Sequence, residues 1–305
     1  MDLLKKIYIV KPPVRWLFLY RDRIFNYFNH RSTQLYQVNF NVVLTIIYKI
    51  VLRVHNGISL KYSFKELIHF FILSGKYSKV NIKKVRFIDL KSLPIFIITL
   101  PCRKDRRDKM TQLFQSSGLS CSFVKGVHGR HLAYGYLKKY FTKSSIKYLS
   151  AGSRGCILSH AKTLALVVEN SFPYALIFED DILTDDNFKT GLEEILSSIP
   201  EDTEILYLLN DGLCNNESML FTPNYPRCGQ YAYLVSQEGA KKILAGLFPV
   251  SIGLGGIDTI IGRMVSKKLL TAYQVKKPIC KADLEDSSNI INSSKPFKKI
   301  HHSEY

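Results

Sequence analysis

Three carboxylates in a row, Glu179-Asp180-Asp181, are the residues of this 305-residue chain best placed to do chemistry. They follow the apolar run 175–178, which predicts a buried strand of a parallel sheet. Ligands bind where the carboxyl ends of such strands meet. Like charges this close repel one another unless a cation lies among them, and oxygen ligands select Mg2+ or Mn2+. The sequence therefore predicts a metal site at Glu179, Asp180 and Asp181, with a solvated acidic turn as the alternative.

A further acid, Asp258, follows a glycine-rich stretch at 253–256 and begins an apolar segment. An Asp at this place commonly caps a helix. A glycine-rich approach is also typical of a mobile loop in an active site. Both interpretations of Asp258 stay open on the residues alone.

Basic residues follow the first predicted strand, at 94–100, which ends in Thr99 and Leu100. Arg103 and Arg106 open a helix that we expect to run from 101 to a glycine cap at Gly118. Unpaired backbone N–H groups and Arg side chains at a helix start can bind phosphate. The alternative is a solvated basic helix face.

His160 lies in a strongly apolar helix predicted at 155–170. A lone His among apolar neighbours is more often a hydrogen-bonded core residue than a catalyst. No Asp or second His at a suitable spacing indicates a nucleophilic triad.

The order of the predicted elements favours an α/β sandwich around a mostly parallel sheet. Besides those named above, we expect strands at 121–125, 204–209 and 229–235, and helices at 186–198 and 240–247. Ser236 is expected to start the last of these helices.

Charge divides the chain unequally. Residues 1–90 hold 16 Lys and Arg against four acids, which is +12 of the total formal charge of +18. Basic residues alternate there with aromatic and aliphatic ones, notably at 42–54 and 64–73. This pattern favours either helices lying in an anionic membrane interface or a small helical domain packed on the core. Binding to nucleic acid is disfavoured, because no recognised basic motif accompanies the charge.

Six cysteines are scattered without a C-x-x-C pair, so neither a zinc site nor a disulfide framework is predicted, and reduced thiols in the cytoplasm are expected. The start of the chain is interrupted by Lys11, Pro12, Pro13 and Arg15 before a signal-peptide core can form. No apolar run reaches the roughly 20 residues of a membrane span. We therefore expect a cytoplasmic protein, peripheral on the cytoplasmic face of the membrane.

Several segments in order resemble one family. They are 97–100 with Arg103 and Arg106, then 155–160 (Gly-Cys-Ile-Leu-Ser-His), then 174–181, then 232–236 with 239–242, and finally Ile257-Asp258. Together they resemble glycosyltransferase family 25, which includes bacterial lipooligosaccharide galactosyltransferases and collagen galactosyltransferases. The similarity covers about residues 93–290. The sequence departs from the usual residues of the family at Gly152-Ser153-Arg154 and at His128-Gly129. These departures affect the identity of the substrate more than the type of reaction.

The resemblance implies a GT-A-like, Rossmann-type catalytic domain at 91–290, preceded by the mainly helical basic segment 1–90 and followed by a polar tail at 291–305. It also implies a UDP-sugar donor, most often UDP-galactose, a divalent cation at the acidic triplet, and inversion at the anomeric carbon. Thr99, Leu100, Arg103, Arg106 and Asp180 are then expected beside the nucleotide. The expected acceptor is a glycan or glycolipid such as lipooligosaccharide or lipopolysaccharide.

A single displacement with inversion requires a carboxylate to take the acceptor's proton, and Asp258 is our candidate for that base. The cation would stabilise the charge that develops on the leaving diphosphate. The main alternative from another class is a catalytically silent relative that serves as a membrane or assembly scaffold.

Overall fold

The computed structural model describes residues 84–209, 230–251, 256–275 and 277–283, with the backbone of two further strands, Tyr77–Ser78 and Leu220–Pro223. Nearly all of the basic segment 1–90, most of the glycine-rich stretch before Asp258 and the tail 291–305 lie outside the described residues.

The centre of the fold is an eight-stranded mixed sheet with the order β1-β9-β11-β8-β10-β5-β3-β4. β9 and β10 run opposite to the other six strands, so the sheet is mostly parallel, as predicted. Its strands are β1 (Tyr77–Ser78), β3 (Ile95–Thr99), β4 (Ser122–Lys125), β5 (Tyr174–Glu179), β8 (Ile205–Tyr207), β9 (Leu220–Pro223), β10 (Ala232–Ser236) and β11 (Ala272–Val275).

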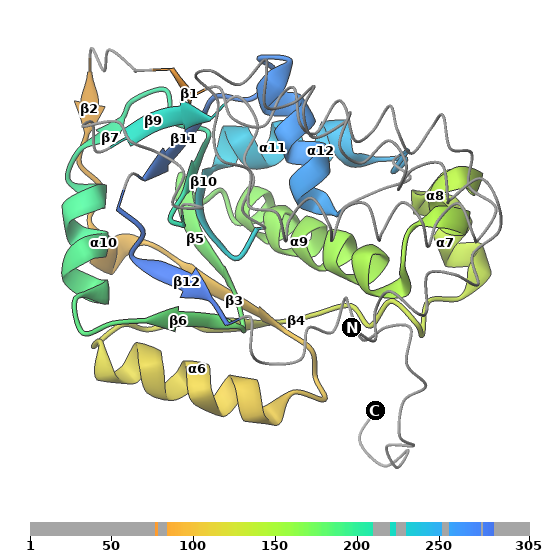
Figure 1. The fold of residues 1–305 in the computed structure, drawn as a ribbon, viewed down its shortest axis with the longest axis horizontal. Coiled ribbons are helices and arrows are strands. Elements are labelled where there is room, and N and C mark those ends of the chain that lie inside the picture. Colours follow the sequence, from red (N-terminus) through yellow and green to blue (C-terminus); the bar gives the residue numbers. More distant parts are fainter. Residues whose placement is uncertain are drawn as a thin grey trace, which may run out of the picture. The chain divides into compact units, whose positions relative to one another are not determined.

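Helices cover both faces of the sheet (Figure 1). One face carries α9 (Ala151–Glu169), α11 (Gln237–Leu247) and α12 (Ile257–Ser266), which contact one another. The other face carries α6 (Lys104–Ser116) and α10 (Phe188–Leu196), whose buried side chains include Phe114 and Phe188. The described part of the chain is therefore a three-layer α/β sandwich.

Alternation along the central strands explains these layers. In β3, Phe96 and Ile98 face the α9 side, while Ile95 and Ile97 face the α6 side. β5 and β10 are likewise buried on both faces, with only Glu179 at the end of β5 partly exposed. Strands buried on both faces read as continuous apolar runs, which is why the sequence predicted them.

Local signals set the ends of three helices. α6 ends where Gly118 adopts φ +65° and Leu119 N donates to Phe114 O at 2.9 Å, the cap expected from the sequence. Ser236 caps α11 by accepting from Gly239 N at 3.0 Å, also as expected. α9 begins at Ala151 behind the cap Ser150, four residues earlier than predicted.

Several short elements complete the fold. α7 (Tyr134–Tyr140) and α8 (Lys143–Tyr148) form a helical connection that the sequence analysis did not predict. The remaining elements are the turn η1 (Leu90–Ser92) and two strand pairs, β2 (Val85–Arg86) with β7 (Ile199–Pro200) and β6 (Ile182–Thr184) with β12 (Cys280–Ala282). Within the described residues, none of the helices combines the length and apolar character needed to cross a bilayer.

Candidate active site

The candidate site lies at the carboxyl-terminal ends of β3 and β5. β3 is bordered by β4 on one side and by β5 on the other, and α6 and α9 connect these strands. The strand order therefore reverses at β3, the point at which open α/β sheets form their ligand crevice. β3 ends at the buried Thr99, which Leu100 follows, and β5 ends at Glu179. These three residues lie at the same edge of the sheet.

The acidic triplet does not act as a single cluster, because its members face different partners. Asp180 Oδ1 accepts from Arg106 Nη1 at 2.7 Å, and Asp181 Oδ2 accepts from the same nitrogen at 3.3 Å. Arg106 is 3% exposed and Asp180 is 7% exposed, so their ion pair is buried. Of the residues predicted beside the nucleotide, Arg106 and Asp180 thus bind each other.

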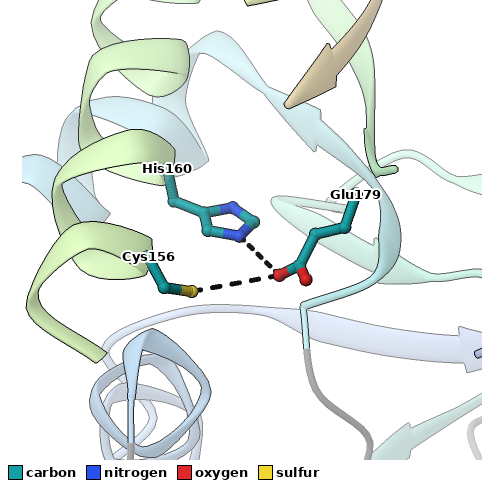
Figure 2. A group of neighbouring side chains, drawn as sticks. All are labelled: Cys156, His160 and Glu179. Atoms are coloured by element: carbon teal, nitrogen blue, oxygen red, sulfur yellow. Dashed lines mark hydrogen bonds and ion pairs between the residues drawn. The ribbon is translucent and has the colours of Figure 1, made fainter. Parts of the chain in front are cut away.

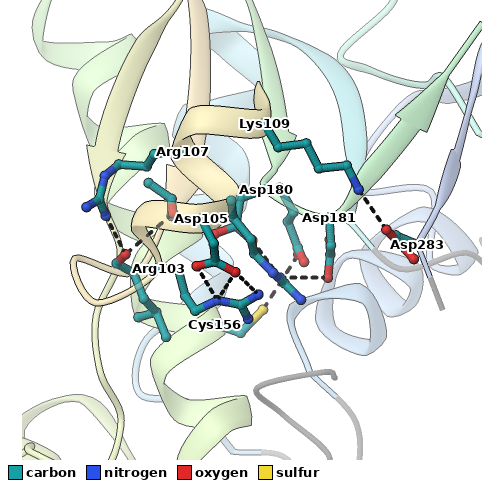
Figure 3. A network of polar contacts seen from close by, with 12 residues as sticks. Arg103, Asp105, Arg107, Lys109, Cys156, Asp180, Asp181 and Asp283 are labelled. Carbon is teal, nitrogen blue, oxygen red and sulfur yellow. Dashed lines mark hydrogen bonds and ion pairs between the residues drawn. The ribbon is translucent and has the colours of Figure 1, made fainter. Parts of the chain in front are cut away.

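The start of α6 is held by further polar contacts (Figure 3). Arg103 binds the exposed Asp105 with two nitrogens, at 3.0 Å from Nε to Oδ1 and 2.7 Å from Nη2 to Oδ2. Arg107 Nη1 donates to the carbonyls of Leu100 and Pro101 at 2.9 and 2.8 Å. These contacts fix the loop that connects β3 to α6 at the edge of the site.

Asp181 has the properties expected of a cation ligand. Its Oδ1 is buried and has no hydrogen-bond partner among the described residues. Burial, followed by repulsion from Glu179, raises the pKa of Asp181 to about 7, in spite of the opposing charge of Arg106. A cation at Oδ1 would remove both penalties, so Asp181 fits a ligand of the divalent ion that was predicted for the triplet.

Glu179 turns toward α9 and away from the Arg106 pair. Its Oε1 lies 2.9 Å from His160 Nε2 and 3.9 Å from Cys156 Sγ (Figure 2). His160 Nδ1 in turn lies 3.0 Å from Tyr233 Oη. His160 is buried and hydrogen-bonded, as the sequence analysis preferred, but its partner is a carboxylate of the candidate site.

Asp258 joins the same site from α12. The helix begins at Ile257 with Gly256 as its N-cap residue, and Asp258 Oδ1 accepts from Gly256 N at 3.0 Å. Burial raises the pKa of Asp258, and repulsion from Glu179 adds to that effect, while N–H donors from Thr259 and Gly256 oppose it. Asp258 is thus in the first turn without being the capping residue, and the charge of Glu179 acts on it.

Tyr231 connects the carboxylates electrostatically. Burial raises the pKa of its phenol, and the charges of Glu179, Asp181 and Asp258 raise it further. The backbone is close as well, since Glu179 N donates to Tyr231 O at 2.7 Å. Three acids that lie up to 79 positions apart in sequence therefore act on the phenol of one tyrosine.

A hollow of about 230 Å³ opens at the ends of β3 and β4. Gly126 is packed closely there, because an added Cβ would lie 3.0 Å from Thr99 O. Two imidazole rings, those of His128 and His131, stack with centroids 4.1 Å apart. The lining residues are Pro101, Cys102, Lys125, Gly126, Val127, His128, His131 and Leu132.

The sequence analysis missed Cys156, Tyr231 and Tyr233 as members of the site. One signal was available, since Cys156 and His160 are four residues apart and therefore share a face of α9. Their approach to Glu179 depends on how α9 packs over β5, which local spacing does not reveal.

Comparison with known proteins agrees with this architecture. Residues 92–253 match the family model described as "Glycosyltransferase family 25 (LPS biosynthesis protein)". The chain belongs to glycosyltransferase family 25. The resemblance noted in the sequence is confirmed, and its specific blocks, including the acidic triplet, lie largely within the matched residues.

The relatives carry names with different implications for activity. Procollagen galactosyltransferase 2 of Homo sapiens is 28% identical over 198 residues, which cover 59% of this chain and 31% of that protein. Inactive glycosyltransferase 25 family member 3 of Homo sapiens is 30% identical over 169 residues, which cover 50% of this chain and 28% of that protein. The chain thus matches only about a third of the length of these relatives.

Proposed function

We propose that this family 25 chain is an inverting glycosyltransferase with a GT-A-type domain, which moves a hexose, most often galactose, from a UDP-sugar to a glycan acceptor such as lipooligosaccharide or lipopolysaccharide. The observation that carries the proposal is the buried Oδ1 of Asp181, which has no hydrogen-bond partner among the described residues and lies next to the strand-order reversal. Burying an ionised carboxylate in this position costs folding free energy unless a ligand offsets its charge.

Glu179 and Asp181 are the residues that would hold Mn2+ or Mg2+. The ion, when bound, would neutralise charge on the diphosphate as the bond to the sugar breaks. Asp180 supports this arrangement indirectly, because its ion pair with Arg106 fixes the backbone that carries Asp181.

The nucleoside part of the donor would enter the hollow between β3 and β4. Thr99 and Leu100 form the strand end that leads to it, and Lys125 and the stacked imidazoles of His128 and His131 line its wall. Arg103 would approach the diphosphate from the start of α6 by exchanging its exposed partner Asp105 for phosphate oxygens.

Asp258 would take the proton of the attacking acceptor hydroxyl. Its raised pKa makes it a stronger base than an ordinary Asp, and its position on α12 places it on a different element from the acids of β5. Metal binding and removal of the acceptor's proton are thereby assigned to separate carboxylates.

The basic segment 1–90 would hold the enzyme on an anionic membrane surface at the cytoplasmic face, where a lipid-linked acceptor is presented. The +12 charge and the interleaved aromatic residues support this placement. The predicted division into 1–90, a catalytic domain at 91–290 and a tail at 291–305 belongs to the same proposal.

Release of UDP from a panel of UDP-sugars, with and without Mn2+, tests the proposal. We expect metal-dependent release that falls at least 100-fold in Asp181→Asn. Asp186→Asn, which removes an exposed acid five residues further on, is the matched control and should behave like the wild type. Equal activity in chelator and in Mn2+ would contradict the metal assignment.

A catalytically silent scaffold is the second candidate, since several relatives are named inactive. It would bind neither a UDP-sugar nor Mn2+ at Asp181. Absence of both UDP binding and turnover on the whole donor panel would favour the scaffold over the transferase.

A further inference from the structure

Cys156, His160 and Glu179 bring three different metal-binding groups together. One ligand atom from each lies within 4.8 Å of the other two. Cys156 and His160 are one turn apart on the same face of α9, the i, i+4 spacing that places two histidines on one zinc ion in the H-E-x-x-H motif. Glu179 supplies the third group from the end of β5 (Figure 2).

The chemistry of this set differs from that of the acidic triplet. Thiolate, imidazole and carboxylate are the usual ligands of zinc, whereas Mg2+ and Mn2+ prefer oxygen. We propose that Cys156, His160 and Glu179 form a Zn2+ site with three protein ligands and a fourth position open to solvent or a small ligand.

The distances are close to those that zinc requires. Bonds of about 2.0 Å to N and O and about 2.3 Å to S, in tetrahedral geometry, separate N from O by about 3.3 Å and S from O by about 3.5 Å. The observed separations from Glu179 Oε1 are 2.9 Å to His160 and 3.9 Å to Cys156. Each of these two separations therefore has to change by about 0.4 Å, and the ligand atoms of Cys156 and His160 lie within 4.8 Å of each other.

Tyr233 provides the support that a zinc-bound histidine needs. Its Oη lies 3.0 Å from His160 Nδ1 and can accept a hydrogen bond from an N–H there. The lone pair of His160 Nε2 is then directed at Glu179 and the metal. Both rings are buried, so the orientation of His160 is fixed by packing before any ion arrives.

Charge also favours a dication here. The Glu179 carboxylate lies beside the thiol, with its Oε1 3.9 Å from Cys156 Sγ. On binding, the thiol releases its proton to solvent, and Zn2+ neutralises the resulting thiolate together with Glu179. The Glu179 carboxylate, which would repel a free thiolate, therefore attracts the cation.

The zinc site shares Glu179 with the proposed Mn2+ site, but zinc binding does not depend on transferase activity. Zinc at Cys156 would draw Glu179 away from the site at Asp181. A protein without any transferase activity could still bind zinc in this way, so the two proposals fail independently.

Titration of the metal-free, full-length protein with Co2+ tests the site, because a cobalt–thiolate bond gives a near-ultraviolet charge-transfer band. We expect a band that Zn2+ removes by displacement and that Cys156→Ser abolishes. Cys121→Ser is the matched control, since this partly buried thiol has a pKa raised by burial but packs on the α6 side of the sheet, with Phe114 and Phe188; it should keep the band.

Asp181→Asn separates the two metal sites. It should lose Mn2+ binding, measured by calorimetry, and keep the cobalt band with less than a threefold change in affinity. A wild-type protein without the band, or a band of equal strength in Cys156→Ser, would overturn the zinc site. Tyr233→Phe should weaken Co2+ binding about tenfold, as expected for the loss of a supporting hydrogen bond.

Discussion

At the scale of single residues, the acids of the site have different surroundings and therefore suit different tasks. Asp180 is neutralised by Arg106, Asp181 has a buried oxygen without a described partner, and Asp258 accepts a backbone N–H at the start of α12. Environments that separate the pKa values of neighbouring acids are typical of sites in which one acid stabilises a positive charge and another transfers a proton.

Asp258→Asn tests the proposed base. The amide keeps the size of the side chain and can still accept from Gly256 N, so we expect the fold to survive. Loss of a general base lowers kcat by about 10²–10⁴-fold. Calorimetry should find unchanged binding of UDP and Mn2+. A variant with full activity would exclude Asp258 as the base, and a variant that no longer binds UDP would assign it to the donor site instead.

The Arg106–Asp180 pair has a consequence for stability. Arg106→Met leaves Asp180 buried without its partner, which should lower the free energy of unfolding by about 3–5 kcal/mol. The double variant Arg106→Met/Asp180→Leu should recover most of this loss, because the buried charge of Asp180 is then absent. Urea unfolding of the single and double variants measures the coupling.

An exposed ion pair provides the comparison. Lys241→Met breaks the surface pair with Glu238 and should cost less than about 1 kcal/mol. A loss of similar size for Arg106→Met would mean that Asp180 reaches solvent, and its assignment as a buried support would be wrong.

At the scale of elements, the turn after β4 and the start of α9 are in backbone contact. A Cβ on Gly155 would lie 2.4 Å from Val127 O and 2.8 Å from Gly129 N. Val127 N also donates to Ser159 Oγ at 2.8 Å. The turn that lines the hollow is thus positioned by α9, the helix that carries Cys156 and His160.

Gly155→Ala should therefore push the turn away from α9. We expect a loss of about 1–3 kcal/mol in the free energy of unfolding and weaker UDP binding, because the wall of the hollow moves. Gly135→Ala in α7 is the control, since nothing lies within 4 Å of its added Cβ; it should stabilise the helix by about 0.5–1 kcal/mol. Unfolding midpoints and UDP affinity of both variants decide whether the contact matters.

How well an element could be predicted depended on whether its signals are local. The strands 95–99 and 174–179 are apolar runs, and Gly118 and Ser236 are local caps, so they were found. α7 was missed because only Leu137 of its seven residues is buried, which leaves no apolar period. The approach of Cys156 to Glu179 was invisible, since it depends on packing between a helix and a strand.

At the scale of the whole molecule, charge is segregated along the chain. No acid occurs between Asp108 and Glu169, and nine Lys and Arg lie in that interval, while ten acids follow between 179 and 204. The first 90 residues carry a further +12. Two separate basic regions could therefore contact an anionic surface, and the proposed membrane function of residues 1–90 requires a test that distinguishes them.

Two triple variants with the same net charge provide that test. Lys5→Glu/Lys6→Glu/Lys11→Glu and Lys138→Glu/Lys139→Glu/Lys143→Glu each change the formal charge from +18 to +12. Each basic residue near an anionic bilayer contributes about 1 kcal/mol of binding free energy. We expect the wild type to bind vesicles with anionic lipid, to bind less in high salt, and to ignore neutral vesicles.

Flotation with vesicles should show at least a 100-fold weaker partition for the first variant and less than a tenfold change for the second. The measurement depends on where the charge lies, because the total is equal in both proteins. The reverse order would assign membrane contact to α7 and α8, and an equal loss in both would mean that only net charge matters. Either result would remove the special role proposed for residues 1–90.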